Sequence, residues 1–397
     1  MVSLFNKSRT KIERTKTNFK RFLLSKINWD NQLIAIKGAR GVGKTTLLLQ
    51  HIKLNLPKDN SVLYISMDEL FFTENNLIEL AEEFSQNDGK YLFLDEVHKY
   101  PNWSREIKLI YDNHPDLKVV FTSSSILEIY KSESDLSRRV VSYTLPEMSI
   151  REFIELENSI KLPIYSLENI LKNHVEIASE INQKIKPILT FNTYNQYGAY
   201  PYFTQGITEY QQKLINTINL IIEVDILAVE NIDFQQVTKI KKLLFAIATS
   251  VPFIPNISKI AEKINISRQS LIKALTYLDK ARLITIINKP NKGITILSKP
   301  DKLYLNNTNI INAIANKNAN IGNIRETFFL NQLKIVSKID LSNKSDFVVN
   351  DTYTFEIGGK NKTKKQIKDI KNAYVIKDNI EYGNGNIIPL WLFGFLY

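Results

Sequence analysis

Short apolar runs alternate with amphipathic stretches along the first third of the chain. Five runs of five to seven residues are almost continuously apolar, which is typical of strands buried on both faces. The runs are LIAIK, SVLYISM, YLFLD, KVVFT and VVSYTL, beginning at residues 33, 61, 91, 118 and 140. Stretches with apolar residues at helical spacing separate most of them, as at Leu77 to Phe84 and Ser104 to Asp112. The alternation predicts an α/β fold with a parallel sheet covered by helices.

The pattern becomes mostly helical after residue 146 and changes again near residue 236. Three short helical segments then precede two alternating runs, LITIINK and GITILSK, which predict a β-hairpin. The predicted helices are Lys239 to Ala248, Ile257 to Ile264 and Ser267 to Ala281. This order is typical of a winged helix, whose third helix would enter a DNA groove. The outward polar residues of that helix are Arg268, Gln269 and Lys273.

The two ends of the chain differ from the middle. The first 30 residues are rich in lysine and arginine and predict a basic arm with a helix that ends near Trp29. The last hundred residues predict a helix, two paired strands, a second helix, a strand and a final apolar run. Those segments are Asn323 to Leu333, SDFVVND, TYTFEIG, Lys364 to Asn372, Ala373 to Lys377 and Ile387 to Phe395.

Composition narrows the class of protein. A chain of 397 residues is long enough for two or three domains at about 150 residues each. Without cysteine there are no disulfides, thiolate metal sites or cysteine nucleophile. No run reaches the roughly 18 apolar residues of a transmembrane helix, and the first residues lack the apolar core of a signal peptide. We therefore expect a cytoplasmic protein that does not bind membranes. The net charge of +11 permits nucleic-acid binding without demonstrating it.

The segment after the first apolar run carries the strongest chemical motif. GARGVGKT, residues 38–45, fits G-x-x-x-x-G-K-[ST], in which backbone N–H groups and a helix N-terminus bind phosphates. Lys44 is expected to reach the β- and γ-phosphates, and the Thr45 hydroxyl to hold Mg²⁺. A strand before the motif and a helix after it support ATP as the cofactor. The expected nucleotide-binding residues are Gly38, Ala39, Arg40, Gly41, Val42, Gly43, Lys44, Thr45 and Thr46.

Two acids, Asp95 and Glu96, follow the third apolar run. At a strand end beside the P-loop, Asp95 is placed to hold Mg²⁺ through water, which is the Walker B role. The adjacent Glu96 is suited to polarise the attacking water. An acidic pair about 50 residues after the P-loop, at the end of an apolar strand, predicts ATP hydrolysis.

Other polar residues have catalytic interpretations with alternatives. Ser123, with Thr122 close behind, ends the next strand and is expected to contact the γ-phosphate or the water; a helix cap is the alternative. Arg138 or Arg139 would act as an arginine finger, in cis or on a neighbouring subunit; a surface arginine is the alternative. His98 is expected to contact substrate or partner rather than a metal.

These motifs, in this order, resemble one group of prokaryotic AAA-type ATPases. The segments that carry the resemblance are GARGVGKTTLL, LDEVHKYPNWSREIK, FTSSSILEI and LSRRVVSYTLPEMSIREF. Members join a P-loop domain and a winged helix to a C-terminal domain that resembles the restriction-endonuclease fold. The ATPase residues that the resemblance implies are Lys44, Thr45, Asp95 and Glu96. Arg139 matches the family arginine, although Arg138 stands where the family has glycine.

The restriction-endonuclease resemblance makes the last domain a candidate nuclease. Such an enzyme needs Asp and Glu ligands for Mg²⁺ and a lysine near the attacking water. Asp346 and Glu356 are spaced for that pair on neighbouring strands, and Glu326 adds a third carboxylate. The usual lysine position, two residues after the Glu, holds glycine, so Lys360 or Lys362 would have to serve. A scaffold or nucleic-acid-binding remnant without nuclease activity is the alternative.

Taken together, the sequence predicts an ATP-binding and ATP-hydrolysing switch of the AAA or signal-transducing type. DNA is a candidate partner through the winged helix and a basic C-terminal face, and protein partners or self-association stay open. An ATP-regulated, Mg²⁺-dependent DNA nuclease is one alternative. The other is a nucleotide-binding regulator that turns over negligibly and recruits partners. The predicted domains are a basic arm (1–30), a P-loop ATPase core (31–146), a helical lid (147–235), a winged helix (236–297) and a restriction-endonuclease-like domain (298–397).

Overall fold

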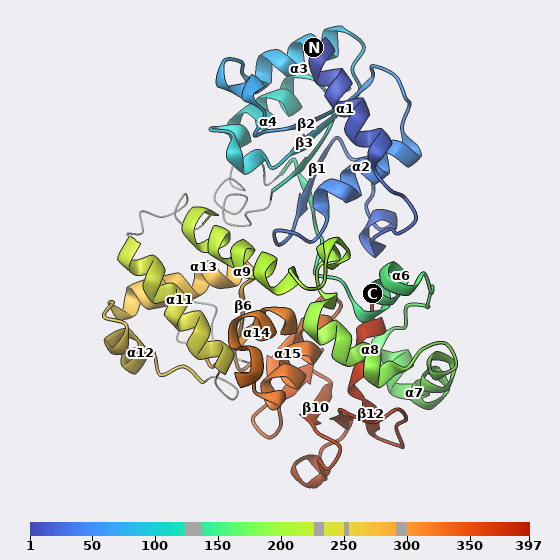
Figure 1. Ribbon diagram of the computed structural model, residues 1–397, viewed down its shortest axis with the longest axis vertical. Helices are drawn as coiled ribbons and strands as arrows, with labels where there is room; N and C mark the ends of the chain where they lie inside the picture. The colour runs from blue at the N-terminus through green and yellow to red at the C-terminus, as the bar shows by residue number, and fades with distance from the viewer. Residues whose placement is uncertain (124–135, 137, 226–233, 250–253, 291–299) are drawn as a thin grey trace. The chain divides into compact units, whose positions relative to one another are not determined.

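The chain folds into two compact units, Met1–Glu147 and Met148–Tyr397 (Figure 1). The computed structural model describes every residue except 124–135, 137, 226–233, 250–253 and 291–299. Over the described ranges, no helix is both long enough and apolar enough to cross a membrane. The finer division into a lid, a winged helix and a nuclease-like domain stays a prediction.

A five-stranded sheet forms the centre of the first unit. Its strands are β1 (Leu33–Lys37), β2 (Val62–Ser66), β3 (Tyr91–Asp95), β4 (Lys118–Thr122) and β5 (Val141–Thr144). All pairings are parallel and the strand order is β2-β3-β4-β1-β5, so the predicted parallel sheet is confirmed. The first strand therefore lies between β4 and β5, and the carboxyl ends of all five strands meet at one edge. Ser66 stands opposite Asp95 there.

Helices cover both faces of this sheet. They are α1 (Val2–Arg14), α2 (Lys44–Asn55), α3 (Leu77–Gln86) and α4 (Trp103–Asn113). Figure 1 shows α3 and α4 on one side and α2 on the other. On the first side, Leu63, Leu94 and Ile107 belong to one core cluster and have no exposed surface. Burial on both faces explains why the strands are apolar without alternation.

The N-terminal segment differs from its prediction. The helix ends at Arg14 rather than near Trp29, and only a 3₁₀ turn, Phe22–Ser25, follows before β1. The reason is tertiary, because side chains of α2 bind the carbonyls of this segment. Gln50 donates to Lys16 and Phe19, and Lys53 donates to Glu13 and Thr15, at 2.7–2.9 Å. Carbonyls that accept these bonds do not need a continuing helix.

A mixed five-stranded sheet and a buried helix organise the end of the second unit. The strands are β8 (Ile339–Leu341), β9 (Phe347–Val349), β10 (Tyr353–Gly358), β11 (Ala373–Lys377) and β12 (Ile387–Pro389), in the order β12-β11-β10-β9-β8. The helix is α15 (Ile321–Leu333), as predicted. Its Phe329 ring lies 4.8–5.8 Å from the rings of Phe347, Phe355 and Phe393. These buried aromatic contacts hold the helix against the sheet.

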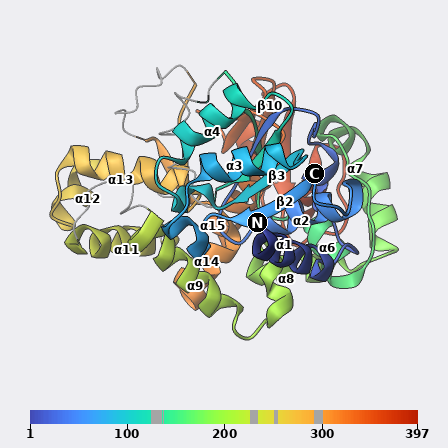
Figure 2. The same ribbon diagram turned by 90° about the horizontal axis from the view of Figure 1, so that it is seen from above.

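Most of the other described residues of the second unit are helical. The helices are α6 (Ile150–Asn158), α7 (Leu167–Asn182), α8 (Pro187–Thr193), α9 (Tyr210–Leu220), α11 (Phe234–Thr249), α12 (Ile257–Lys263), α13 (Arg268–Lys280) and α14 (Thr308–Ala315). Figures 1 and 2 both place α11, α12 and α13 together at one end of this unit, where three helices were predicted. The strand after them, β6 (Ile284–Ile287), pairs antiparallel with β7 (Lys302–Leu305). The segment GITILSK, predicted as its partner, lies outside the described residues.

The helix predicted at Lys364 to Asn372 is wrong. Only a 3₁₀ turn, Lys365–Ile367, forms between β10 and β11. The segment has two apolar residues, Ile367 and Ile370, which is too few for a helical face that can be buried. Asn372 has a φ of 54°, a left-handed conformation that ends the loop before β11.

Candidate functional site

The P-loop leaves the carboxyl end of β1 and leads into α2. Gly38 has a φ of 155°, and a Cβ there would lie 2.4 Å from the main-chain oxygen of Leu145. Gly43 caps α2 with a φ of 96°, which strains any residue with a side chain. Glycine at both positions lets the loop pass close to the neighbouring backbone. The N-terminus of α2 therefore faces the loop, where N–H groups attract anions.

Lys44 places a positive charge inside this loop. Its Nζ donates to the main-chain oxygens of Gly38 and Ala39, both at 2.9 Å, and the residue is 6% exposed. The loop thus curves around a buried ammonium group. This is the arrangement that the motif requires of a phosphate-binding lysine.

Arg21 fixes the same loop from the N-terminal segment. The guanidinium is buried and donates to the carbonyls of Val42 and Pro146, at 2.6 and 2.7 Å. One arginine therefore ties the P-loop backbone to the chain that follows β5. The sequence pattern does not predict this role, because nothing in it distinguishes Arg21 from the other basic residues around it.

The carboxylate of Asp95 is held by hydroxyl groups from three elements. Thr45 of α2 and Tyr64 of β2 donate to its Oδ2 at 2.7 and 2.8 Å, and Thr122 of β4 donates to its Oδ1. Asp95 is 3% exposed. The two residues predicted to hold Mg²⁺, Thr45 and Asp95, are thus in direct contact. A hydroxyl and a carboxylate are oxygen ligands suited to Mg²⁺, so the residues fit this ion.

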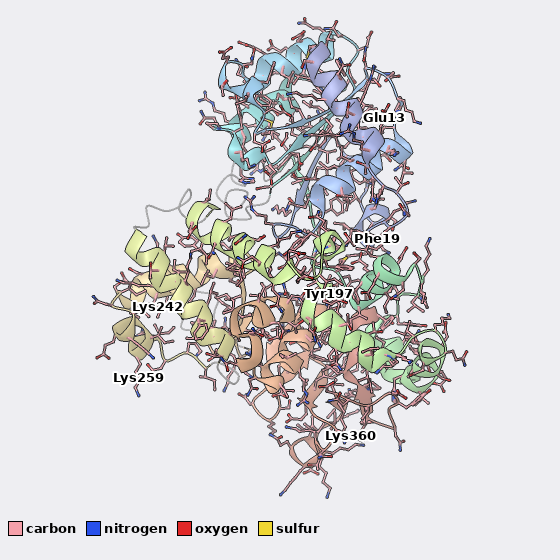
Figure 3. The ribbon with its side chains drawn as sticks, viewed as in Figure 1. Glu13, Phe19, Tyr197, Lys242, Lys259 and Lys360 are labelled. Carbon is pink, nitrogen blue, oxygen red and sulfur yellow. The ribbon has the colours of Figure 1, made fainter. Side chains whose placement is uncertain are left out.

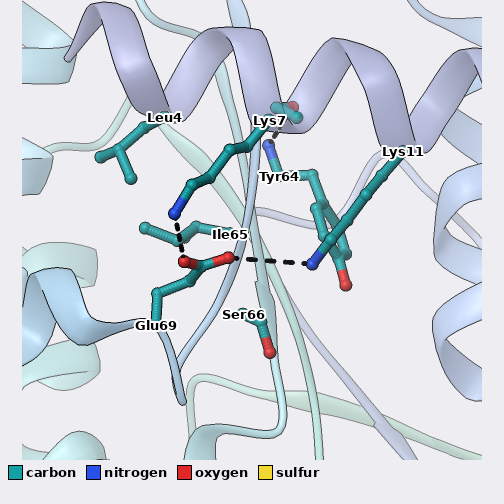
Figure 4. A pocket seen from close by; sticks show the side chains of 8 residues that line it. Leu4, Lys7, Lys11, Tyr64, Ile65, Ser66 and Glu69 are labelled. Carbon is teal, nitrogen blue, oxygen red and sulfur yellow. Dashed lines mark hydrogen bonds and ion pairs between the residues drawn. The ribbon is translucent and has the colours of Figure 1, made fainter.

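The role of Tyr64 is also not predicted by the sequence, since Tyr64 is an aromatic residue inside an apolar strand. Burial and the nearby Asp95 raise the pKa of Tyr64 far above its ordinary value, so its hydroxyl remains a donor. A small hollow between β2 and α1 lies at the same place (Figure 4). Lys11 has its Nζ 5.3 Å from the centre of the Tyr64 ring. Ser8 accepts a hydrogen bond from the Tyr64 N–H at 3.1 Å.

Glu96 stands beside this cluster in a left-handed conformation, with a φ of 56°. Its N–H donates to Thr122, and its carboxylate lies 2.5 Å from Nζ of Lys99. Lys99 also binds Asp68 at 2.7 Å. Burial alone would raise the pKa of Glu96, but the hydrogen bond and charge of Lys99, together with Arg40, hold it below its usual range. Glu96 is therefore an anion whose position depends on Lys99.

Ser123 and His98 lie against each other at the same edge. Ser123 is fully buried, and its Oγ is 3.0 Å from Nδ1 of His98. Burial lowers the pKa of His98 to about 4; Glu96 opposes this shift, and the cations Arg40, Lys44 and Lys99 add to it. His98 is thus neutral near pH 7. The Ser123 hydroxyl therefore contacts His98, a contact that its position at the end of a strand did not predict.

Arg139 is not brought to this cluster. It precedes β5 by two residues, which puts it at the amino edge of the parallel sheet, opposite the P-loop. There its guanidinium donates to both carboxylate oxygens of Asp112, at 2.8 and 3.0 Å. The predicted catalytic role of Arg139 in its own chain has no geometric support. A role toward a neighbouring subunit stays a prediction.

In the second unit, two of the candidate nuclease carboxylates, Glu326 and Glu356, lie close enough to the third, Asp346, to affect its charge. Glu326 accepts hydrogen bonds from Tyr304 at 2.6 Å and Lys302 at 2.8 Å. Burial, with the charges of Glu326 and Glu356 nearby, raises the pKa of Asp346 to about 7. The two partners of Glu326 show that this carboxylate is already bound by protein groups.

Of the two lysines predicted to replace the usual one, Lys360 and Lys362, the structure places Lys362 beside Glu356. Lys362 forms an ion pair with Glu356, whereas the Lys360 main-chain oxygen accepts from Lys377. A Cβ on Gly358 would lie 2.6–2.7 Å from the Lys362 side chain, so Lys362 fills the space beside that glycine. Within the described part of the chain, no group of three or more histidine or acidic side chains is arranged to hold a metal ion.

The helix predicted to enter DNA is present as α13. Ser267 caps it, accepting from the Ser270 N–H at 3.0 Å. Arg268, Gln269 and Lys273 are exposed on it. Their contact with DNA stays a prediction.

Comparison with known families supports the prediction of an ATPase domain in the first unit. Residues 30–154 match a family described as AAA domain, and residues 188–320 match one described as Domain of unknown function (DUF8612). Two uncharacterized proteins of Methanocaldococcus jannaschii are 28% identical over 271 residues and 26% identical over 291 residues. These alignments cover 65% and 69% of this chain. The chain spans 57% and 60% of the length of these relatives.

Solved structures also match parts of the chain. A Walker-type ATPase of Pyrococcus abyssi is 13% identical with a TM-score of 0.41, covering 78% of this chain and 94% of that one. AMPPCP-bound DnaA from Aquifex aeolicus is 16% identical with a TM-score of 0.24, covering 65% and 84%. Both TM-scores are low, so the assignment depends on the family match and on the site itself. That match and the geometry of the P-loop support an AAA-type ATPase domain over residues 30–154.

Proposed function

We propose that the first unit binds ATP with Mg²⁺ and hydrolyses it, and that this cycle drives a molecular switch. The contact between Thr45 and Asp95 carries the proposal. It joins the P-loop to the acid at the end of β3, beside the buried ammonium of Lys44. Nucleotide hydrolysis requires a phosphate-binding loop beside an acid that can hold a metal ion, and such sites form at the carboxyl edge of a parallel sheet.

Each residue has a role that follows from its surroundings. Lys44 and the N–H groups at the start of α2 would bind the phosphates. Thr45 and Asp95 would hold Mg²⁺, which neutralises phosphate charge. Glu96, an anion at the same edge, would accept a proton from the attacking water. Arg21 would keep the loop in place by its bonds to Val42 and Pro146.

ATP binding should depend on Lys44. Lys44→Ala removes the charge inside the loop, and we expect calorimetry to show little or no binding. Lys58→Ala is the matched control, since it removes an exposed lysine of the same unit outside the loop. Equal ATP affinity for Lys44→Ala and the control would remove the basis of the proposal.

Hydrolysis should depend on Glu96 more than binding does. Glu96→Gln should bind ATP like the wild type and turn over about 100-fold more slowly, the scale of lost general-base catalysis. Glu82→Gln, on the exposed face of α3, controls for loss of a carboxylate. An unchanged kcat would show that another group activates the water.

The ion pair between Glu96 and Lys99 favours a second candidate. A carboxylate bound to an ammonium group is a weaker base, so the chain would act as a nucleotide-binding regulator with negligible turnover and recruit partners. Tight ATP binding with no measurable turnover in the wild type would select this function. Turnover that is lost in Glu96→Gln would select the ATPase.

A further inference from the structure

The loop between β10 and β11 concentrates positive charge. We call residues 359–372 the basic loop. Its lysines are Lys360, Lys362, Lys364, Lys365, Lys368 and Lys371, and its one acid is Asp369. Figure 3 shows Lys360 where this loop extends beyond β10. The ATP site belongs to the other unit, so this feature is separate from the proposed function.

Five of the six lysine charges of the basic loop are not neutralised by any residue that the structure describes. All of them except Lys362 are exposed. Lys362 pairs with Glu356, but the other five form no ion pair with any residue that the structure describes. Five unpaired cations within twelve residues produce a strong local positive potential. Such a potential attracts a polyanion.

The loop is anchored by its two apolar residues. Ile367 is 4% exposed and belongs to a core cluster with Ala373 and Val375 of β11. Ile370 packs against the same cluster. The apolar side chains thus fix the loop to the sheet, and the lysines remain on its outer side.

The composition of the outer side favours phosphate over protein as the bound group. Protein interfaces need an apolar centre and are depleted in lysine, while arginine and aromatic residues are enriched. The basic loop has no arginine, no aromatic residue and no exposed large apolar side chain. The loop also carries exposed side chains that can donate hydrogen bonds, namely Asn361, Thr363, Gln366 and Asn372. Lysine with amide and hydroxyl donors is a common phosphate-contacting set.

We propose that the basic loop binds the phosphate backbone of nucleic acid. Lysines act as point charges, so the binding is expected to have little sequence preference. Each phosphate neutralised contributes about −0.9 to the slope of log K against log salt on duplex DNA. Five lysines in contact predict a slope of about −4.5, and an affinity several hundredfold weaker at 200 mM than at 50 mM salt.

The test compares two fourfold variants of the full chain with equal loss of charge. The loop variant carries Lys364→Gln, Lys365→Gln, Lys368→Gln and Lys371→Gln. The control carries Lys58→Gln, Lys90→Gln, Lys172→Gln and Lys186→Gln, all exposed positions outside the loop. Fluorescence anisotropy with labelled duplex DNA, single-stranded DNA and RNA gives affinities over a salt series. Circular dichroism and ATP binding check that both variants fold.

We expect the wild type and the control to have the same steep slope of log K against log salt. The slope of the loop variant should be shallower by about 3.6, because each of its four missing lysines contributes about 0.9. The three probes identify the nucleic acid that supplies the phosphates. Equal slopes for the loop variant and the control would overturn the proposal. So would binding that is lost in Arg268→Gln but kept in the loop variant, since that would assign it to α13. Binding to vesicles with anionic lipid, but to no nucleic acid, would also overturn it.

Discussion

At the scale of single residues, Lys99 controls the charge state of Glu96. The ammonium of Lys99 bridges Glu96 and Asp68, residues that follow β3 and β2. Burial works in the opposite direction and would favour the protonated acid. The balance between them decides at which pH Glu96 is able to accept a proton.

Lys99→Met should move the acid limb of the pH–rate profile to higher pH. Without the ammonium, burial dominates and the pKa of Glu96 rises. Glu96 is then protonated, and inactive as a base, over a wider acidic range, so activity is lost earlier as pH falls. The measurement is kcat/KM for ATP hydrolysis across pH, because that quantity reports the free enzyme.

Lys90→Met is the control for this experiment, since Lys90 is exposed and precedes β3 at the opposite end of the strand. Its acid limb should coincide with that of the wild type. If Lys99→Met also coincides with the wild type, Glu96 does not limit the acid side of the profile.

Part of the site was readable from the sequence, because the P-loop and the strand-end acids have fixed spacing. Lys44, Thr45 and Asp95 meet in the structure as that spacing predicts. Tyr64 and Arg21 were not readable. Their roles depend on which strand is the neighbour of β3 and on which carbonyls lie beside the N-terminal segment, and both are tertiary facts.

At the scale of elements, α1 covers the edge of the sheet that β2 forms. β2 is an edge strand, and an edge presents unpaired N–H and C=O groups. Ser8 of α1 accepts from the Tyr64 N–H of that edge, and it is 2% exposed. Lys7 and Lys11 bind Glu69 just beyond the strand. The helix thus protects the edge and satisfies one of its donors.

Ser8→Ala should loosen this attachment. A buried N–H left without an acceptor costs about 1–3 kcal/mol of the free energy of unfolding. Hydrogen exchange measured by mass spectrometry should show faster exchange in peptides that contain β2. Ser3→Ala makes the same change at an exposed position of the same helix, and surface changes are usually within about 0.5 kcal/mol. Unchanged exchange in Ser8→Ala would show that the Tyr64 N–H is protected by another group.

Strand ends were more predictable than helix ends. β1, β3 and β4 begin and end where their apolar runs do, since burial on both faces requires a continuous run. The helix predicted to end near Trp29 stops at Arg14 because α2 binds the carbonyls beyond it. The absent helix at Lys364 to Asn372 shows the reverse case, in which lysines with good helix propensity lack an apolar face.

At the scale of the whole molecule, the two units differ in how much their sequence reveals. The first contains a motif whose spacing encodes a phosphate site, and a family match covers most of it. The second contains no such motif over residues 188–320, where the matching family has no stated function. The roles of its carboxylates cannot be predicted from the sequence, because they depend on lysine partners that the sequence pattern does not identify. Lys302 is distant in sequence from its partner Glu326, and Lys362 is farther from Glu356 than the usual spacing.

The ion pairs of these carboxylates predict that cleavage of nucleic acid is absent or very slow. Lys362 neutralises Glu356 and Lys302 neutralises Glu326, while the usual lysine position is Gly358. We expect no cleavage of plasmid or single-stranded DNA with Mg²⁺ or Mn²⁺, with or without ATP.

The full chain and three variants decide this question, because cleavage by a contaminant would not respond to changes in the carboxylates. Asp346→Ala and Glu356→Ala remove two of the candidate ligands, and Lys44→Ala removes ATP binding without touching the second unit. Cutting by the wild type that disappears in both carboxylate variants but persists in Lys44→Ala would reverse the conclusion. Lys362 would then have to leave Glu356 when Mg²⁺ binds, and Lys362→Met should raise the affinity for Mg²⁺ by removing a competing cation.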